Sequence, residues 1–206
     1  MNDLIKRYPA LEVCRADISA ALELIVKGYE NGGKLLLCGN GGSAADCEHI
    51  SGELLKGFMS KRPLNAEEKA KMSEKCPELE HRVLDMLQHG LSAIPLPSLS
   101  ALGSAFANDV DASLVYAQGV LSLGKENDVL LAISTSGNAE NVLNAARVAR
   151  ALGMKVIGLS GMSGGKLRSV CDVCICVPEA ETYKVQELHL PVYHYICEGI
   201  EKHFFG

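Results

Sequence analysis

Two residues whose side chains can hold a metal ion or move a proton, His49 and Glu53, lie four positions apart in the segment AADCEHISGEL. In a helix, that spacing puts the imidazole and the carboxylate on one face. A pair of this kind is more often an ordinary surface contact than a site. Its meaning therefore depends on the elements that position it.

The residues before this pair predict a strand that turns sharply into the helix. LLLC, from Leu35 to Cys38, is a continuous apolar run, as in a central parallel strand covered on both faces. The turn NGGS, with Asn40, Gly41 and Gly42, tolerates unusual backbone angles and can cap a helix. Backbone N–H groups at such a helix start attract an anion, usually a phosphate. The spacing of the glycines matches neither the dinucleotide nor the nucleoside-triphosphate fingerprint, so neither cofactor is favoured.

A second segment repeats this arrangement. The apolar run DVLLAIS ends in three hydroxyl-bearing residues, Ser134, Thr135 and Ser136, before a helical pattern. Hydroxyls and backbone N–H groups at a helix start form an uncharged cradle for a phosphomonoester, although they also serve as plain helix caps. Open α/β sheets bind ligands at the carboxyl ends of their strands, so two such turns indicate a phosphate site more strongly than one.

Strand patterns near residues 34, 91, 128, 155 and 173 alternate with helical patterns. This alternation predicts an α/β fold with a three-layer, doubly wound, five-stranded parallel sheet in one domain over residues 1–206. An N-terminal helix is expected over residues 3–31, with Pro9 as the point where its first turn can break off, packed on another subunit or on the final helix. That final helix is expected over residues 182–205, with Pro191 interrupting its hydrogen bonding. Mixed charges and two prolines in residues 59–90 predict an inserted helical excursion or lid, with a helix starting at Asn65.

Composition excludes several classes of protein. A net charge of −5 gives no bulk attraction for nucleic acid or an anionic membrane. The sequence shows neither a signal-peptide core nor an apolar stretch of about 20 residues, so a cytoplasmic protein is expected. The eight cysteines are expected to be reduced. A metal role for the cluster of Cys171, Cys174 and Cys176 is disfavoured, because no second cluster accompanies it.

The segments GNGGSAADCEHISGEL, ISTSGNAENV and VQELHLPVYH together resemble a SIS (sugar isomerase) domain, and more narrowly the phosphoheptose isomerase family. The resemblance covers residues 30–205 apart from the insertion. It implies homotetramers with active sites between subunits and a metal, generally zinc, held by His49, Glu53, Gln186 and His194. It also places sugar-phosphate contacts on Asn40, Gly41, Gly42, Glu53, Asn108, Asp109, Ser134, Thr135, Ser136 and Gln186.

The reaction implied by the resemblance is the conversion of sedoheptulose 7-phosphate to an aldoheptose 7-phosphate through an enediolate. Glu53 suits the catalytic base and His194 the acid, and zinc would polarise the carbonyl. Gln186 and His194 are eight residues apart, about 12 Å along an ideal helix. One metal ion would reach both only through a bend in the helix or with a ligand from another chain.

Two departures from the family pattern leave the exact sugar open. Ala139 replaces a phosphate-binding serine, and Tyr183 replaces a residue that is commonly aspartate. Isomerisation of another sugar phosphate therefore remains an alternative. A non-catalytic SIS module that senses a sugar phosphate or binds a partner protein is another, but such a module has no need of the four metal-binding side chains together.

Overall fold

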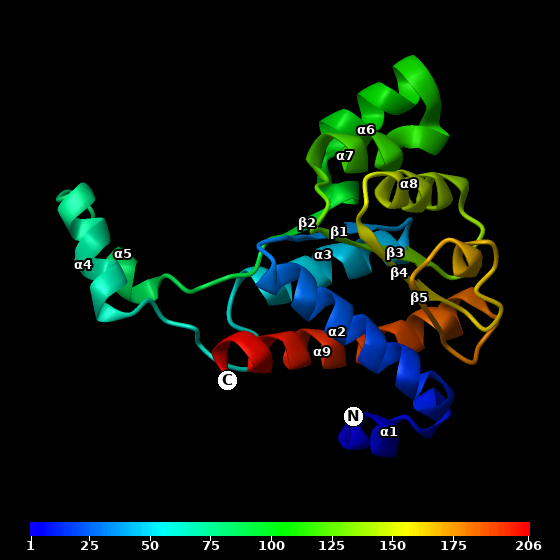
Figure 1. The fold of residues 1–206 in the computed structure, drawn as a ribbon, viewed down its shortest axis with the longest axis horizontal. Helices are drawn as coiled ribbons and strands as arrows, with labels where there is room; N and C mark the ends of the chain where they lie inside the picture. The colour runs from blue at the N-terminus through cyan, green and yellow to red at the C-terminus, as the bar shows by residue number, and fades with distance from the viewer.

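The computed structural model describes residues 1–206 and contains a five-stranded, all-parallel sheet in the order β2-β1-β3-β4-β5 (Figure 1). The strands are β1 (Leu35–Cys38), β2 (Ala93–Pro95), β3 (Val129–Ser134), β4 (Lys155–Ser160) and β5 (Val173–Cys176). The predicted doubly wound sheet is confirmed. The winding reverses between β1 and β3, so their carboxyl ends lie where open α/β sheets bind ligands.

Alternate residues of the central strands point to opposite faces of the sheet and build two cores. Leu35 and Leu37 of β1 belong to the larger core, and Leu36 and Cys38 to the smaller one. The larger core is covered by α2 (Arg15–Glu30), α3 (Gly42–Leu55) and α9 (Thr182–Phe205). The smaller core is covered by α7 (Val115–Leu123) and α8 (Glu140–Ala151). Figure 1 shows these two helical layers on either side of the sheet, with α6 (Ser100–Phe106) beside α7.

The N-terminal segment is helical, as expected over residues 3–31, and it breaks at Pro9. It consists of α1 (Asn2–Arg7), a 3-10 helix (Pro9–Cys14) and α2. A proline disfavours helical angles at the residue before it, and Tyr8 accordingly has φ −130° and ψ 73°. The expected packing on the final helix is confirmed, because α2 lies along α9 (Figure 1).

The inserted residues form an arm, residues 64–87, that projects from the body at the left of Figure 1. It contains α4 (Ala66–Lys75) and α5 (His81–Met86). Asn65 starts α4 with the predicted capping box: its side chain accepts from the Glu68 N–H at 2.9 Å, and the Glu68 carboxylate accepts from the Asn65 N–H at 2.8 Å. The predicted helical excursion is confirmed. The arm projects away from the sheet and does not line the cleft of its own chain, so the alternative of a lid stays a prediction.

The final helix, α9, spans the predicted residues 182–205 and continues as one helix through Pro191, where an interruption was expected. None of the helices combines the length and the apolar character that crossing a bilayer requires. All eight cysteines are free thiols.

Candidate active site

A cleft of about 320 Å³ lies at the carboxyl ends of β1 and β3, and both predicted turns line it. The fold therefore brings the predicted phosphate contacts on the two turns together with Gln186 of α9. The lining residues are Asn40, Gly41, Gly42, Ser43, Ile133, Ser134, Thr135, Ser136, Ala139, Thr182 and Gln186.

Three helices begin at this cleft. The first residue of α3 is Gly42, Ala139 precedes α8, and Thr182 is the first residue of α9. None of the three has a side-chain cap. Their N-terminal partial charges are positive, so the cleft favours an anion even though no lysine or arginine lines it. The sequence indicated two of these helix starts, and the third, from α9, was missed.

Two glycines shape the turn after β1. Gly41 has φ +56° and ψ −120°, which side chains rarely permit. Gly42 lies so close to Gln186 that a Cβ would come within 2.3 Å of Nε2. The absence of a side chain at residue 42 therefore allows the Gln186 amide to reach the cleft.

The side chain of Asn40 is held in place by its neighbours. Its amide and that of Asn141 exchange two hydrogen bonds of 2.9 Å. The Tyr116 hydroxyl donates to the Gly39 carbonyl at 2.7 Å and lies 3.2 Å from the Asn40 Oδ1. The turn is thus ordered before any ligand binds, which lowers the entropic cost of binding.

A group of acid–base side chains lies further along α3, where it meets α9. His49 Nε2 is 3.3 Å from Glu53 Oε1 and 3.4 Å from His194 Nε2. The other Glu53 oxygen is 3.3 Å from Lys56 Nζ. Burial lowers the pKa of His194, the neighbouring His49 and Arg7 lower it further, and Glu53 opposes them. The lowered pKa favours the neutral imidazole of His194.

The donor atoms of this group suit zinc. Two imidazole nitrogens and a carboxylate oxygen are typical zinc ligands, and neighbouring ligands of a tetrahedral zinc ion lie roughly 3.3 Å apart. The separations of 3.3 and 3.4 Å from His49 Nε2 match that spacing. These two separations alone do not make a metal site in the single chain, because no group of three His, Cys, Asp or Glu side chains is placed to hold a metal ion.

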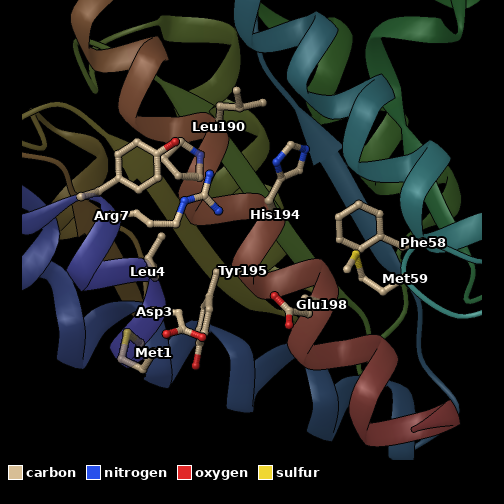
Figure 2. A pocket seen from close by; sticks show the side chains of 12 residues that line it. Met1, Asp3, Leu4, Arg7, Phe58, Met59, Leu190, His194, Tyr195 and Glu198 are labelled. Carbon is tan, nitrogen blue, oxygen red and sulfur yellow. The ribbon is translucent and has the colours of Figure 1, made fainter.

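His194 also borders a hollow of about 470 Å³ between α1, α9 and the loop that leaves α3. Figure 2 shows its imidazole near Phe58 and Met59, with Arg7 of α1 and Leu190 also lining the hollow. The Phe58 and His194 rings lie 5.7 Å apart. His194 is therefore accessible from a side of the chain that does not include the phosphate cleft.

Three predicted site residues are not brought into the acid–base group. Asn108 and Asp109 lie in a helical turn over Ala107–Asp111, are exposed, and bond to each other at 2.7 Å. They do not line the cleft. Gln186 lines the cleft, whereas His194 lies about two turns further along α9, on the other side of Pro191.

Sequence reasoning missed Tyr193, which contacts His49, and Asp46, which contacts Tyr193. The Tyr193 hydroxyl lies 3.0 Å from His49 Nδ1 and donates to Asp46 Oδ1 at 3.3 Å. Asp46 precedes His49 by three residues and so shares its helix face. That spacing was a usable signal, but nothing in the sequence showed that Tyr193 would lie between them.

Comparison with known proteins agrees with this geometry. The SIS domain family model matches residues 3–85 and 88–161. A phosphoheptose isomerase from Helicobacter pylori (strain P12) is 37% identical over 195 residues, which cover 95% of this chain and 88% of the relative. A phosphoheptose isomerase from Thiobacillus denitrificans is 39% identical over 203 residues, covering 97% and 90%.

Solved structures give the same result. A phosphoheptose isomerase from Neisseria gonorrhoeae superposes with a TM-score of 0.77 at 31% identity, covering 98% of this chain and 94% of the other. One from Francisella tularensis gives 0.78 at 32% identity, covering 95% and 91%. The chain therefore belongs to the SIS domain family and, within it, to the phosphoheptose isomerases.

Proposed function

We propose that this protein converts sedoheptulose 7-phosphate to D-glycero-D-manno-heptose 7-phosphate through an enediolate. The names of its relatives support this reaction. The observation that carries it is the placement of an anion cleft and an acid–base group on the same two helices, α3 and α9.

The phosphate would lie in the cleft, where the Ser134, Thr135 and Ser136 turn faces three helix N-termini. From Gly42 to His49, α3 rises about 10 Å. That separation suits an extended sugar whose phosphate and carbonyl are at opposite ends. Ala139 offers no hydroxyl to the phosphate, which weakens binding by about 1 kcal/mol relative to serine.

The isomerisation moves one proton between carbons and one between oxygens. Glu53 takes the proton from C1 of the ketose and returns it to C2. His194 carries the proton from O1 to O2, and a neutral imidazole suits that exchange because it can both give and accept a proton. Both side chains lie next to His49, so the two transfers occur at one end of the bound sugar.

His49, Glu53 and His194, completed by Gln186 of this or a neighbouring chain, would hold a zinc ion. Bound zinc would polarise the substrate carbonyl and stabilise the developing negative charge. Glu53 and His194 keep the proton-transfer roles described above.

We further propose that the protein works in the cytoplasm as a homotetramer with its active sites between subunits. Asn108 and Asp109 are exposed and lie outside the cleft of their own chain. Gln186 and His194 are separated by two helical turns. Both observations are accounted for if a neighbouring chain completes each site.

The proposal is tested by incubating the zinc-loaded protein with sedoheptulose 7-phosphate and following the sugar by NMR. An aldoheptose 7-phosphate is expected, with loss of turnover after chelation and recovery on adding zinc. A six-carbon ketose phosphate run in parallel tests the alternative sugar. If neither sugar reacts but sedoheptulose 7-phosphate raises the melting temperature, the protein is a sensor and the proposal is wrong.

A further inference from the structure

We propose that Tyr193 and Asp46 form a hydrogen-bond relay that holds His49 with a proton on Nδ1 and turns Nε2 toward Glu53 and His194. Tyr193 and Asp46 are positioning residues in this scheme, because they act through His49. The effect on turnover rests on the proposed function, whereas the effect on His49 does not.

The relay joins two helices that are distant in sequence. Asp46 and His49 lie one turn apart on α3, and Tyr193 reaches across from α9. Tyr193 is 2% exposed, and its ring meets the His49 ring edge to face, with centroids 5.4 Å apart. The hydroxyl is 3.3 Å from Asp46 Oδ1 and 3.0 Å from His49 Nδ1.

The direction of the hydrogen bonds follows from counting protons. A phenol has one proton to donate, and an ionised carboxylate can only accept. The Tyr193 hydroxyl therefore donates its hydrogen bond to Asp46, and its oxygen can only accept a hydrogen bond from His49. His49 must then donate from Nδ1, which determines its tautomer when the ring is neutral.

The tautomer of His49 determines what its other ring nitrogen, Nε2, can bind. Nε2 of neutral His49 presents a lone pair 3.3 Å from Glu53 Oε1, itself an acceptor, and 3.4 Å from His194 Nε2. Acceptors that face one another favour a cation or a proton between them. A histidine whose second nitrogen donates to a neighbour is the usual arrangement of a metal ligand.

The surroundings of the Asp46 carboxylate also support the relay. Its Oδ2 is buried and has no hydrogen-bond partner. A buried, unpartnered carboxylate oxygen destabilises the fold, so its presence calls for a compensating role. Accepting the Tyr193 proton is the only side-chain hydrogen bond that Asp46 makes.

The direct test is ring-nitrogen NMR of His49, assigned by comparison with His49→Gln. The wild-type protein is expected to show a protonated Nδ1. In Tyr193→Phe the ring should lose that preference and populate the Nε2–H tautomer. Tyr195→Phe is the matched control, because its hydroxyl makes no hydrogen bond in the structure, and it should leave the His49 signals unchanged. An unprotonated Nδ1 in the wild type, or an unchanged pattern in Tyr193→Phe, overturns the proposal.

Kinetic measurements distinguish a positioning role of Tyr193 and Asp46 from a general loss of structure. Tyr193→Phe should lower kcat about tenfold while KM for the sugar phosphate stays within about twofold, because the phosphate cleft is untouched. Asp46→Asn should lower kcat likewise, since it removes the charged acceptor without changing shape. An unchanged kcat in both variants contradicts the relay's role in turnover. If the wild type has the predicted tautomer but no isomerase activity, the relay stands and the proposed function fails.

Discussion

The side-chain amide of Gln186 packs directly over Gly42, where a Cβ would lie 2.3 Å from Nε2. Gly42→Ala should therefore push Gln186 out of the cleft while leaving the fold intact, because the displaced atom is the end of a flexible side chain. We expect binding of sedoheptulose 7-phosphate to weaken about tenfold, the loss of one hydrogen bond to a charged group. Calorimetric titration measures the change.

Gly52→Ala is the control for this substitution. Gly52 is also in α3, but a Cβ there meets nothing within 4 Å. The alanine should stabilise the helix by about 0.5–1 kcal/mol and leave ligand affinity unchanged. Equal affinities for Gly42→Ala and Gly52→Ala would show that Gln186 does not contact the substrate.

Glu201 and Arg62 form a buried ion pair that anchors the loop beside His194. The Glu201 carboxylate accepts from the backbone N–H groups of Phe58, Met59 and Ser60 and from Arg62 Nε at 2.8 Å. Glu201→Gln leaves the buried guanidinium without its counter-charge and should destabilise the fold by about 3–5 kcal/mol in urea unfolding. Glu198→Gln, at an exposed position of α9, should change stability by less than about 0.5 kcal/mol.

The Glu201 carboxylate also makes the stability of the fold depend on pH. Burial would raise the pKa of Glu201, but its hydrogen bonds and the charge of Arg62 outweigh burial and lower it. Because the pKa is lower in the folded protein, this stabilisation is present above the ordinary glutamate pKa and is lost as pH falls through the folded value. The difference in stability between the wild type and Glu201→Gln should therefore shrink as the pH falls below about 4, and a difference that stays constant down to low pH would contradict this account.

His189 gives a separate pH dependence at higher pH. It is fully buried, neither ring nitrogen has a hydrogen-bond partner, and burial lowers its pKa to about 4. The unfolded chain, with a histidine pKa of about 6.5, binds the proton first. The free energy of unfolding should therefore have its full value above about pH 6.5. It should fall by about 3 kcal/mol as the pH approaches 4.

His189→Leu should flatten this part of the profile. The leucine removes the titrating group and two unpaired buried nitrogens, so stability at pH 7 should not fall sharply. Urea midpoints measured at pH 7 and pH 5 provide the comparison. The same loss between those pH values in both proteins would mean that another group is responsible.

The arm can be removed at a natural junction. Pro63 and Gln88 form a bridge at its base, and the His89 N–H donates to the Arg62 carbonyl at 2.8 Å. Replacing residues 64–87 with two glycines should leave the melting temperature within a few degrees, because the arm lies away from both cores. Turnover should also be retained. A folded but inactive deletion variant would show that the arm reaches a site, which could then only be on a neighbouring chain.

The parts of the fold predicted from sequence are those determined by local pattern. The runs LLLC and VLLAIS are apolar throughout because both faces of the central strands are covered. The helix expected over residues 3–31 breaks at Pro9, as that proline indicated, but the 3-10 helix over Pro9–Cys14 was not predicted. Charge content indicated that the arm is solvated but not the direction in which it points.

The residues of the candidate site that could be predicted from sequence are likewise those determined by local pattern. His49 and Glu53 were found because a four-residue spacing is a property of one helix. Tyr193 was missed because its contact with His49 depends on how α9 is rotated against α3, which no local pattern determines. Asn108 and Asp109 lie outside the cleft of their own chain, and a single sequence does not show what faces them.

The proton transfers assigned to Glu53 give the most direct test of the account. Glu53→Gln keeps the shape of the side chain but removes the base, so we predict no detectable conversion of sedoheptulose 7-phosphate. The phosphate cleft does not include Glu53, so the variant should still bind the sugar phosphate with nearly wild-type affinity by calorimetry. Conversion at a wild-type rate by Glu53→Gln would contradict the account.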